Sequence, residues 1–416
     1  MTEVNGDSPE VSKQAKLPWR DWMVLPLLAL LTVGLLAKST EFVARRMFSE
    51  SKNGVERCWV VNDPSTGVRG VPNSTCWEKI AEAQLIEYKF NACGHRAGVE
   101  CGLKPPDAYR IVMTGSSFAM GMRVPREQTL AALLPKELSR LSGRKVEIYN
   151  EGMGDAFTHS VALRFNEVLA ARPDMILWVL TPMDIQQASF VVPHHDASAG
   201  HGEIKRRLKD ALAARSVLDK VRGLSNLAGD VWANELEEVH DDVRVSRAGF
   251  LLQHFLYESQ SLYVESYLRS EDDKSGFLKA DLSARWRNNL RQTEVDAADI
   301  ESRAEAAGVP FVVVPLPNRA QAAMISMGQW PAGYDPYKLD DELRAIIERH
   351  GGTYIDVLQD FRSVPNPEKH YLPIDGHPDA DGHAIITGLL AKELTGGAVP
   401  ALASANRQQA QLEHRR

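Results

Sequence analysis

Short apolar runs alternate with segments of helical periodicity from residue 109 onward, and this alternation limits the folds open to the chain. The clearest run is Met175–Leu180 (MILWVL), which contains no polar residue. Strands of this kind are apolar on both faces because helices cover both sides of a parallel sheet. The order of strands and helices therefore predicts an α/β fold, a three-layer α/β/α sandwich with a parallel sheet.

The strands and helices of this sandwich are assigned by residue range. Strands are expected at Tyr109–Thr114, Val146–Asn150, Met175–Leu180, Val309–Pro315 and Thr353–Val357. Helices are expected at Gln128–Leu141, Thr158–Ala171, Ala280–Gly308 and Ala380–Leu394. The gap between the third and fourth strands is far longer than the dozen or so residues that a crossover needs. We therefore expect a helical insertion at about 190–279, with helices at Glu203–Leu218 and Gln253–Leu268, above the active-site edge of the sheet.

The N-terminal part of the chain has a different organisation. Residues 1–16 are polar and are expected to be disordered, as is the tail 397–416. Residues 17–37 contain Trp22–Ala37, an uncharged run that spans about 24 Å as a helix. A cleaved signal peptide is the alternative, but no small-residue cleavage site follows the run cleanly. We therefore expect a single transmembrane anchor, continued by an amphipathic juxtamembrane helix at Lys38–Phe48.

All four cysteines lie in the lead-in that follows the anchor, residues 38–105, at Cys58, Cys76, Cys93 and Cys101. An even number of cysteines in a loop-rich stretch predicts two disulfides in an oxidising compartment. Local pairing of the first with the second and the third with the fourth is the simplest of three connectivities. A zinc site is the competing interpretation, but the spacing lacks a Cys-x-x-Cys knuckle. The domain after the anchor, residues 106–396, is thus expected on the periplasmic or extracellular side of a cell inner membrane.

The charge balance argues against a nucleic-acid partner. The 416 residues carry a net charge of −7, without a long basic block, so no nucleic acid is expected to bind. His194, His195 and Asp196 are poor metal ligands, because adjacent histidines point to different sides and no third ligand is set by spacing. Neither a metal nor a cofactor is expected.

A turn of small residues, Gly115–Gly121 (GSSFAMG), follows the first strand directly. The carboxyl ends of strands in open α/β sheets are where ligands and nucleophiles are held. Late in the chain, Asp375 and His377 stand two residues apart. With Ser117 they provide the parts of a Ser-His-Asp triad, in which His377 takes the serine proton and Asp375 orients the imidazole. The alternatives are a helix N-cap role for Ser117 and His383 as the base.

These motifs resemble those of SGNH (GDSL-type) hydrolases, whose catalytic domain opens with Gly-Asp-Ser-x-x-x-Gly. Gly115–Gly121 matches this first block, with Ser117 as the nucleophile and Ser116 in place of the usual aspartate. Asp375 and His377 match the fifth block, in the tight Asp-x-His form seen in membrane-anchored and polysaccharide-acetylating relatives. The resemblance implies an SGNH-hydrolase or flavodoxin-like sheet.

The second and third blocks of that family supply donors to the oxyanion hole. Asn150–Gly154 resembles the second block, with the N–H of Gly152 as a donor beside the N–H of Ser117. The third block has an asparagine as a further donor, but the matching residue here is Asp184. An ionised carboxylate would repel the oxyanion, so Asp184 could act there only when protonated.

The resemblance implies a serine hydrolase that acts on ester bonds without a cofactor, of the carboxylesterase or acetylesterase type. Its expected partners are the membrane, through the N-terminal helix, and an ester-bearing substrate, either an acylated extracytoplasmic polysaccharide or a small ester. Two alternatives stay open. One is O-acetyl transfer to an exopolysaccharide through the same triad, and the other is a non-catalytic glycan-binding or assembly protein, which Ser116 and Asp184 would suit.

Overall fold

The computed structural model describes residues 19–50, 54–63, 67–188, 246–270 and 273–403. The predicted helix Glu203–Leu218, the His194–Asp196 group, the N-terminal tail 1–16 and residues 404–416 lie outside these ranges. The strands and helices below are those of the described residues.

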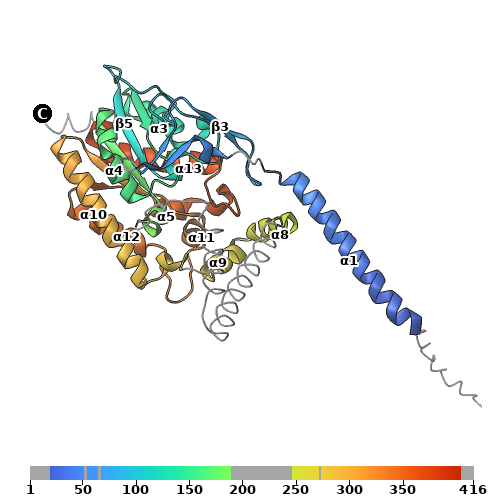
Figure 1. Cartoon of the computed structure of the whole chain (residues 1–416). Helices are drawn as coiled ribbons and strands as arrows, with labels where there is room; N and C mark the ends of the chain where they lie inside the picture. The colour runs from blue at the N-terminus through green and yellow to red at the C-terminus, as the bar shows by residue number, and fades with distance from the viewer. Residues whose placement is uncertain (1–18, 51–53, 64–66, 189–245, 271–272, 404–416) are drawn as a thin grey trace, which may run out of the picture.

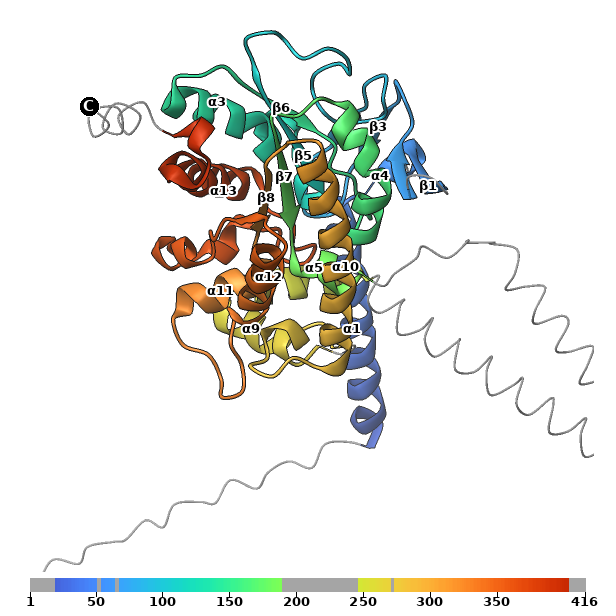
Figure 2. The ribbon, with the colours of Figure 1, turned by 90° about the vertical axis from the view of Figure 1, so that its left-hand side faces the viewer.

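A five-stranded parallel sheet forms the centre of the molecule (Figure 2). Its strands are β5 (Tyr109–Gly115), β6 (Val146–Asn150), β7 (Met175–Leu180), β8 (Phe311–Pro315) and β9 (Thr353–Tyr354). They lie in the order β6-β5-β7-β8-β9, so β6 is on one side of β5 and the later strands are on the other. Ligands of such sheets bind outside the carboxyl ends of the strands where the order reverses, here between β5 and β7.

Helices cover both faces of the sheet, which confirms the predicted three-layer sandwich (Figure 2). On one face lie α3 (Leu130–Ser142) and α13 (Ala380–Glu393), which pack against each other. On the other lie α4 (Thr158–Ala170), α10 (Ala284–Ala306) and α12 (Lys338–Arg349).

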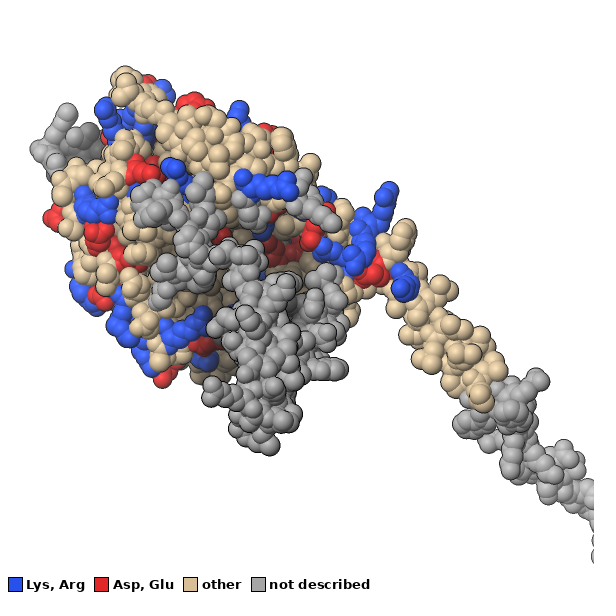
Figure 3. Space-filling view, in the orientation of Figure 1, with Lys and Arg blue, Asp and Glu red and all other residues tan. Residues whose placement is uncertain are grey.

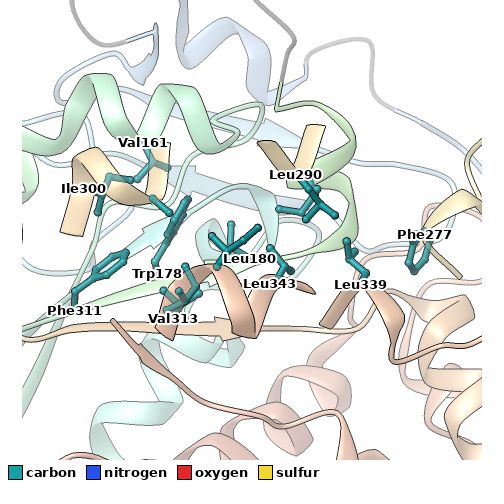
Figure 4. Close-up of a cluster of buried hydrophobic side chains, with 14 of the residues drawn as sticks. Val161, Trp178, Leu180, Phe277, Leu290, Ile300, Phe311, Val313, Leu339 and Leu343 are labelled. Carbon is teal, nitrogen blue, oxygen red and sulfur yellow. The ribbon is translucent and has the colours of Figure 1, made fainter. Parts of the chain in front are cut away.

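The packing of strand β7 explains why its sequence contains no polar residue. Its side chains alternate between the two faces: Ile176, Trp178 and Leu180 join the cluster under α4, α10 and α12, while Met175, Leu177 and Val179 join the cluster under α3 and α13. Figure 4 shows the first of these clusters, in which Trp178 and Leu180 meet side chains from the covering helices, among them Val161, Ile300 and Leu343. A strand between two helical layers therefore has no face left for water.

Two sequence predictions are wrong in detail. The predicted helix Gln253–Leu268 is two helices, α8 (Arg247–Tyr257) and α9 (Gln260–Leu268), because Ser259 adopts the extended backbone of an N-cap residue. Residues 397–403, predicted as disordered tail, form short helical turns at Leu394–Ala398 and Pro400–Leu402. Val399 and Leu402 are buried in the core beneath α3 and α13, and this burial orders the segment.

The lead-in before the sandwich forms two antiparallel hairpins tied by disulfides. β1 (Trp59–Asp63) pairs with β2 (Gly67–Gly70), and β3 (Thr75–Glu78) pairs with β4 (Ile86–Lys89). Short hairpins of this kind are marginally stable alone, so covalent ties matter. The disulfides are Cys58–Cys76 and Cys93–Cys101, the local pairing that the sequence favoured.

Helix α1 (Trp19–Met47) extends away from the body of the molecule (Figure 1). Within it, Met23–Met47 is long enough and apolar enough to cross a membrane, with a mean hydropathy of 1.8. Figure 3 shows this helix as mainly uncharged, with charged side chains gathered at the end next to the body. An N-terminal helix of this composition suits a membrane anchor and also a signal sequence.

Leu177→Ala is expected to lower the free energy of unfolding by about 2–5 kcal/mol, because truncation of this fully buried side chain of β7 leaves a cavity in the hydrophobic core. Leu163→Ala is the matched control, since its side chain in α4 is 42% exposed and should cost less than about 1 kcal/mol. Urea unfolding of the full chain in detergent, followed by circular dichroism, measures both. Equal losses would contradict the place of β7 at the centre of the core.

Candidate active site

Ser117 lies at the carboxyl end of β5, as the first residue of a short helix, α2 (Ser117–Met120). The turn into this helix requires glycine at 115, where φ is 140° and a Cβ would lie 2.3 Å from the carbonyl oxygen of Val179. Gly121 ends the helix in the left-handed conformation, with φ of 74°. This tight strand-turn-helix presents the hydroxyl of Ser117 to a cavity at the edge of the sheet.

Ser117, His377 and Asp375 form a continuous line of hydrogen bonds. His377 Nε2 lies 2.8 Å from Ser117 Oγ, and His377 Nδ1 lies 2.5 Å from Asp375 Oδ1. Asp375 Oδ1 also accepts from the backbone N–H of His377 at 3.3 Å. With the proton on Nδ1, held by the carboxylate, Nε2 is free to accept the proton of the serine hydroxyl.

The surroundings of Asp375 favour its ionised form. Burial raises the pKa of the Asp375 carboxyl. The hydrogen bond and charge of His377, together with the charge of Arg123, outweigh this effect and lower the pKa to about 2. Arg123 Nε donates to Asp375 Oδ2 at 3.1 Å, so each carboxylate oxygen has its own cationic or imidazole partner. An ionised aspartate is the form that fixes the histidine tautomer and stabilises the imidazolium.

His383, the rival base in the sequence, lies elsewhere. It is buried in α13, and its Nδ1 accepts from the backbone N–H of Leu130 at 3.2 Å. Burial, with the charges of His377 and Arg96, lowers the pKa of His383 to about 3. His383 therefore joins α13 to the start of α3 as a neutral side chain, and it is His377 that the fold brings to Ser117.

The glycine expected as an oxyanion donor is already engaged. The N–H of Gly152, just after β6, donates to Asn150 Oδ1 at 2.9 Å. A Cβ here would lie 2.5 Å from Met120 N, so glycine lets this loop approach α2. The next glycine, Gly154, donates to Met120 Sδ at 3.3 Å, and a thioether is a weak acceptor. The N–H of Ser117 stands at the open first turn of α2, at the cavity.

Asp184 accepts hydrogen bonds in the structure, whereas the oxyanion-donor role considered for it needs a protonated carboxyl. It belongs to α5 (Pro182–Gln186), and its Oδ2 accepts from the N–H of Thr181 at 2.7 Å and from the Thr181 hydroxyl at 2.5 Å. These contacts cap the N-terminus of α5. Burial raises the pKa of Asp184 to about 6, although hydrogen bonds from Thr181 and Ser116 oppose this shift.

Ser116 and Asp184, the two departures from the family pattern, lie close enough for Ser116 to lower the pKa of the Asp184 carboxyl. Both side chains are buried, at 3% and 1% exposure. The family pattern has a carboxylate directly after Gly115. In this chain a carboxylate, that of Asp184, comes instead from the start of α5, after the neighbouring strand β7. The sequence identified each departure separately but contained no sign of this contact.

The triad opens into a cavity of about 1140 Å³. Part of its wall comes from the described portion of the predicted insertion, through Tyr257 of α8 and Tyr263 and Tyr267 of α9. Asn318, the N-cap of α11 (Arg319–Met327), donates to Tyr267 Oη at 2.9 Å and also lines the cavity. The insertion thus provides aromatic and hydroxyl groups to the space beside Ser117.

Among the described residues we find no group of histidine, cysteine and carboxylate side chains suited to hold a metal ion.

No family model matches the sequence, and no curated protein matches it. Distant solved structures include TesA, with 12% identity over 70% of this chain and 99% of that chain and a TM-score of 0.36. A lipase/acylhydrolase from Enterococcus faecalis has 14% identity over 69% and 95% of the two chains, with a TM-score of 0.32. A putative acylhydrolase from Bacteroides fragilis has 12% identity over 72% and 92%, with a TM-score of 0.33. At these scores the similarity assigns no activity, which has to be argued from the geometry of the site.

Asp184→Asn is expected to gain stability relative to the wild type as the pH rises from about 4 to about 6. The pKa of Asp184 in the folded protein, about 6, lies above its ordinary value of 3.8. Between these two pH values the folded protein keeps a proton that the unfolded chain has released, so the wild type loses stability as the pH rises. Over this pH range, the free energy of unfolding of Asp184→Asn minus that of the wild type should grow by on the order of 1–3 kcal/mol.

Urea titrations of both proteins across this pH range measure the difference. The Asp341→Asn variant, at an exposed position in α12, is the matched control for replacement of a carboxylate. A pH-independent difference for Asp184→Asn would contradict the ionisation of this buried carboxyl.

Proposed function

We propose that the protein is a serine hydrolase acting on ester bonds. The observation that carries this proposal is the hydrogen-bonded line from Ser117 through His377 to Asp375, at the carboxyl edge of the sheet and open to a cavity. A serine hydroxyl alone is a weak nucleophile, and a histidine oriented by a carboxylate is the usual means of activating it.

In the proposed mechanism, Ser117 Oγ attacks the ester carbonyl while His377 Nε2 takes the hydroxyl proton. Asp375 stabilises the imidazolium that results, and the N–H of Ser117 donates to the developing oxyanion. His377 then gives its proton to the departing alkoxide, which leaves an acyl group on Ser117. Water, deprotonated by His377, releases the acid and restores the serine.

We place the substrate outside the cytoplasm, on an acylated glycan or a small ester. Two disulfides and an apolar N-terminal helix support an anchored domain on the periplasmic or extracellular side of an inner membrane. The cavity combines tyrosine rings with amide and charged side chains, and such amphipathic walls suit a polar, hydroxyl-rich ligand. An acetyl ester of a polysaccharide meets both conditions.

Ser117→Ala and His377→Ala are each expected to lower turnover of p-nitrophenyl acetate by at least about 1000-fold, because each removes a member of the proposed triad. Full-length protein in detergent is used, and the exposed Ser363→Ala and the loop variant His370→Ala are matched controls. A fluorophosphonate probe should label the wild type and both controls but not Ser117→Ala. Labelling that survives in Ser117→Ala would contradict the assignment of Ser117 as the nucleophile. No labelling of the wild type would contradict the proposal and favour a non-catalytic glycan-binding role.

Hydrolysis and acyl transfer share this triad and differ in what attacks the acyl-serine. Incubation with an acetyl donor, with and without a glycan acceptor, separates them by product analysis. We expect free acetate in both cases, since water reaches a cavity of this size. Acetylated glycan as the main product would instead support the O-acetyltransferase alternative.

A further inference from the structure

The loop that carries Asp375 is held by the disulfide-linked lead-in, a part of the chain that the proposed mechanism does not use. Glu82, between β3 and β4, has a side chain that is only 1% exposed. Its Oε2 accepts from the backbone N–H of Asp375 at 2.9 Å. The same carboxylate accepts from the N–H of Ile374, at 3.0 Å to Oε1 and 3.1 Å to Oε2. Glu82 thus fixes the backbone on which the carboxylate of Asp375 is mounted.

A second carboxylate of the lead-in reaches the side chain of Asp375 through an arginine. Arg123 follows α2, donates from Nε to Asp375 Oδ2 at 3.1 Å, and forms an ion pair through Nη1 with Glu78 at the end of β3. Tyr88 Oη accepts from the backbone N–H of Arg123 at 2.9 Å and donates to Glu78 Oε2 at 3.1 Å. The side chains of Arg123 and Glu78 are 15% and 8% exposed, so solvent screens this pair weakly.

We propose that Glu78 and Glu82 are positioning residues for the triad: Glu78 acts through Arg123, and Glu82 acts through the backbone of Ile374 and Asp375. This inference rests on the proposed function of the same site. Neither residue touches the reacting atoms, and each acts by holding Asp375 where it can orient His377.

The tip of the loop is closed by a backbone hydrogen bond from the N–H of Gly376 to the carbonyl of Leu372 at 2.9 Å, which leaves the N–H groups of Ile374 and Asp375 to Glu82. Gly376, between the two triad residues, has φ of 83°, and a Cβ there would meet no atom within 4 Å. Glu78 also shares the positive charge of Arg123, which would otherwise be paired with Asp375 alone. The Cys58–Cys76 disulfide closes two residues before Glu78 and ties β3 in place. The lead-in is therefore part of the site as well as a link to α1.

The charges of these residues predict shifts in the pH dependence of kcat/KM that a mere loosening of the Asp375 loop would not produce. The charged or titratable groups near His377 are Asp375 in its own loop, Arg123 after α2, and Glu78 and Glu82 in the lead-in. His254 of α8, paired with Glu82, and Arg319 of α11, which donates to the carbonyl of Pro373, also face this region, while His383 in α13 is neutral. Loss of the positive charge in Arg123→Gln makes protonation of His377 easier and moves the acid limb of kcat/KM to higher pH. Loss of a negative charge in Glu78→Gln or Glu82→Gln moves it to lower pH, by roughly 0.3–1 pH unit in each case.

The experiment measures p-nitrophenyl acetate turnover by the full chain in detergent across pH. Glu78→Gln and Glu82→Gln should each lower kcat by about 10- to 100-fold with KM changed by less than about 2-fold, since the triad is misplaced while the cavity is kept. The matched control is Glu127→Gln, whose side chain is 68% exposed four residues after Arg123, and it should behave as the wild type. Thermal unfolding of every variant confirms that the fold is retained.

Arg123→Lys keeps the positive charge but is too compact to bridge two carboxylates, so it should lower kcat and leave the acid limb unmoved. Folded Glu78→Gln and Glu82→Gln variants with kcat within about 2-fold of the wild type would overturn the proposal, as would limb shifts of the same sign for Arg123→Gln and Glu78→Gln. Where one variant fails to fold, the others carry the test, because each carboxylate is examined separately.

A readout without turnover separates this inference from the proposed function. The low-field proton resonance of the His377–Asp375 hydrogen bond should weaken or shift in Glu78→Gln and Glu82→Gln and stay unchanged in Glu127→Gln. This signal depends on the position of Asp375 and not on any substrate. A wild type that lacks Ser117-dependent turnover would defeat the proposed function, whereas an unchanged resonance in both variants would defeat the positioning role.

Discussion

The hydrogen bond between Asp375 and His377 is the interaction on which the rest of the site depends. A carboxylate only 18% exposed needs compensation, and the Asp375 carboxylate has the imidazole of His377, the guanidinium of Arg123 and the backbone N–H of His377. Three separate parts of the fold meet there: β5 and α2 present Ser117, the loop before α13 presents Asp375 and His377, and the lead-in holds that loop. The site is therefore a property of the whole sandwich with its lead-in, since no single one of these parts contains it.

A second buried carboxylate explains how the chain departs from the GDSL pattern without losing a coherent core. Asp184 is placed at the start of α5, where the N–H and hydroxyl of Thr181 and the hydroxyl of Ser116 surround it. Desolvation disfavours its charge, and these donors offset part of the cost. The contact ties the turn before Ser117 to the end of β7. Under the proposed function, this acceptor role leaves the backbone N–H of Ser117 as the oxyanion donor.

Much of the fold and part of the site were predictable because they depend on local sequence. The apolar run of β7, the glycine before Ser117, the close Asp-x-His pair and the near-neighbour cysteines each carry their meaning within a few residues. The contact of Glu82 with Asp375 joins positions 293 residues apart, and that of Arg123, the partner of Glu78, joins positions 252 residues apart. No periodicity of the sequence marks these contacts. The engagement of the Gly152 N–H by Asn150 likewise depends on a side-chain rotamer that a motif cannot specify.

Glu82 also connects the site to α1. Its Oε1 lies 2.9 Å from His254 Nδ1 in α8, and the ring of His254 packs against Phe48. Glu41 in α1 accepts from the backbone N–H groups at the start of α8, which satisfies donors that the helix cannot pair itself. Helix α8 is thus held at one end by α1 and near the other by the carboxylate that holds Asp375. Glu82 therefore contacts both the loop that carries Asp375 and the helix that packs against α1.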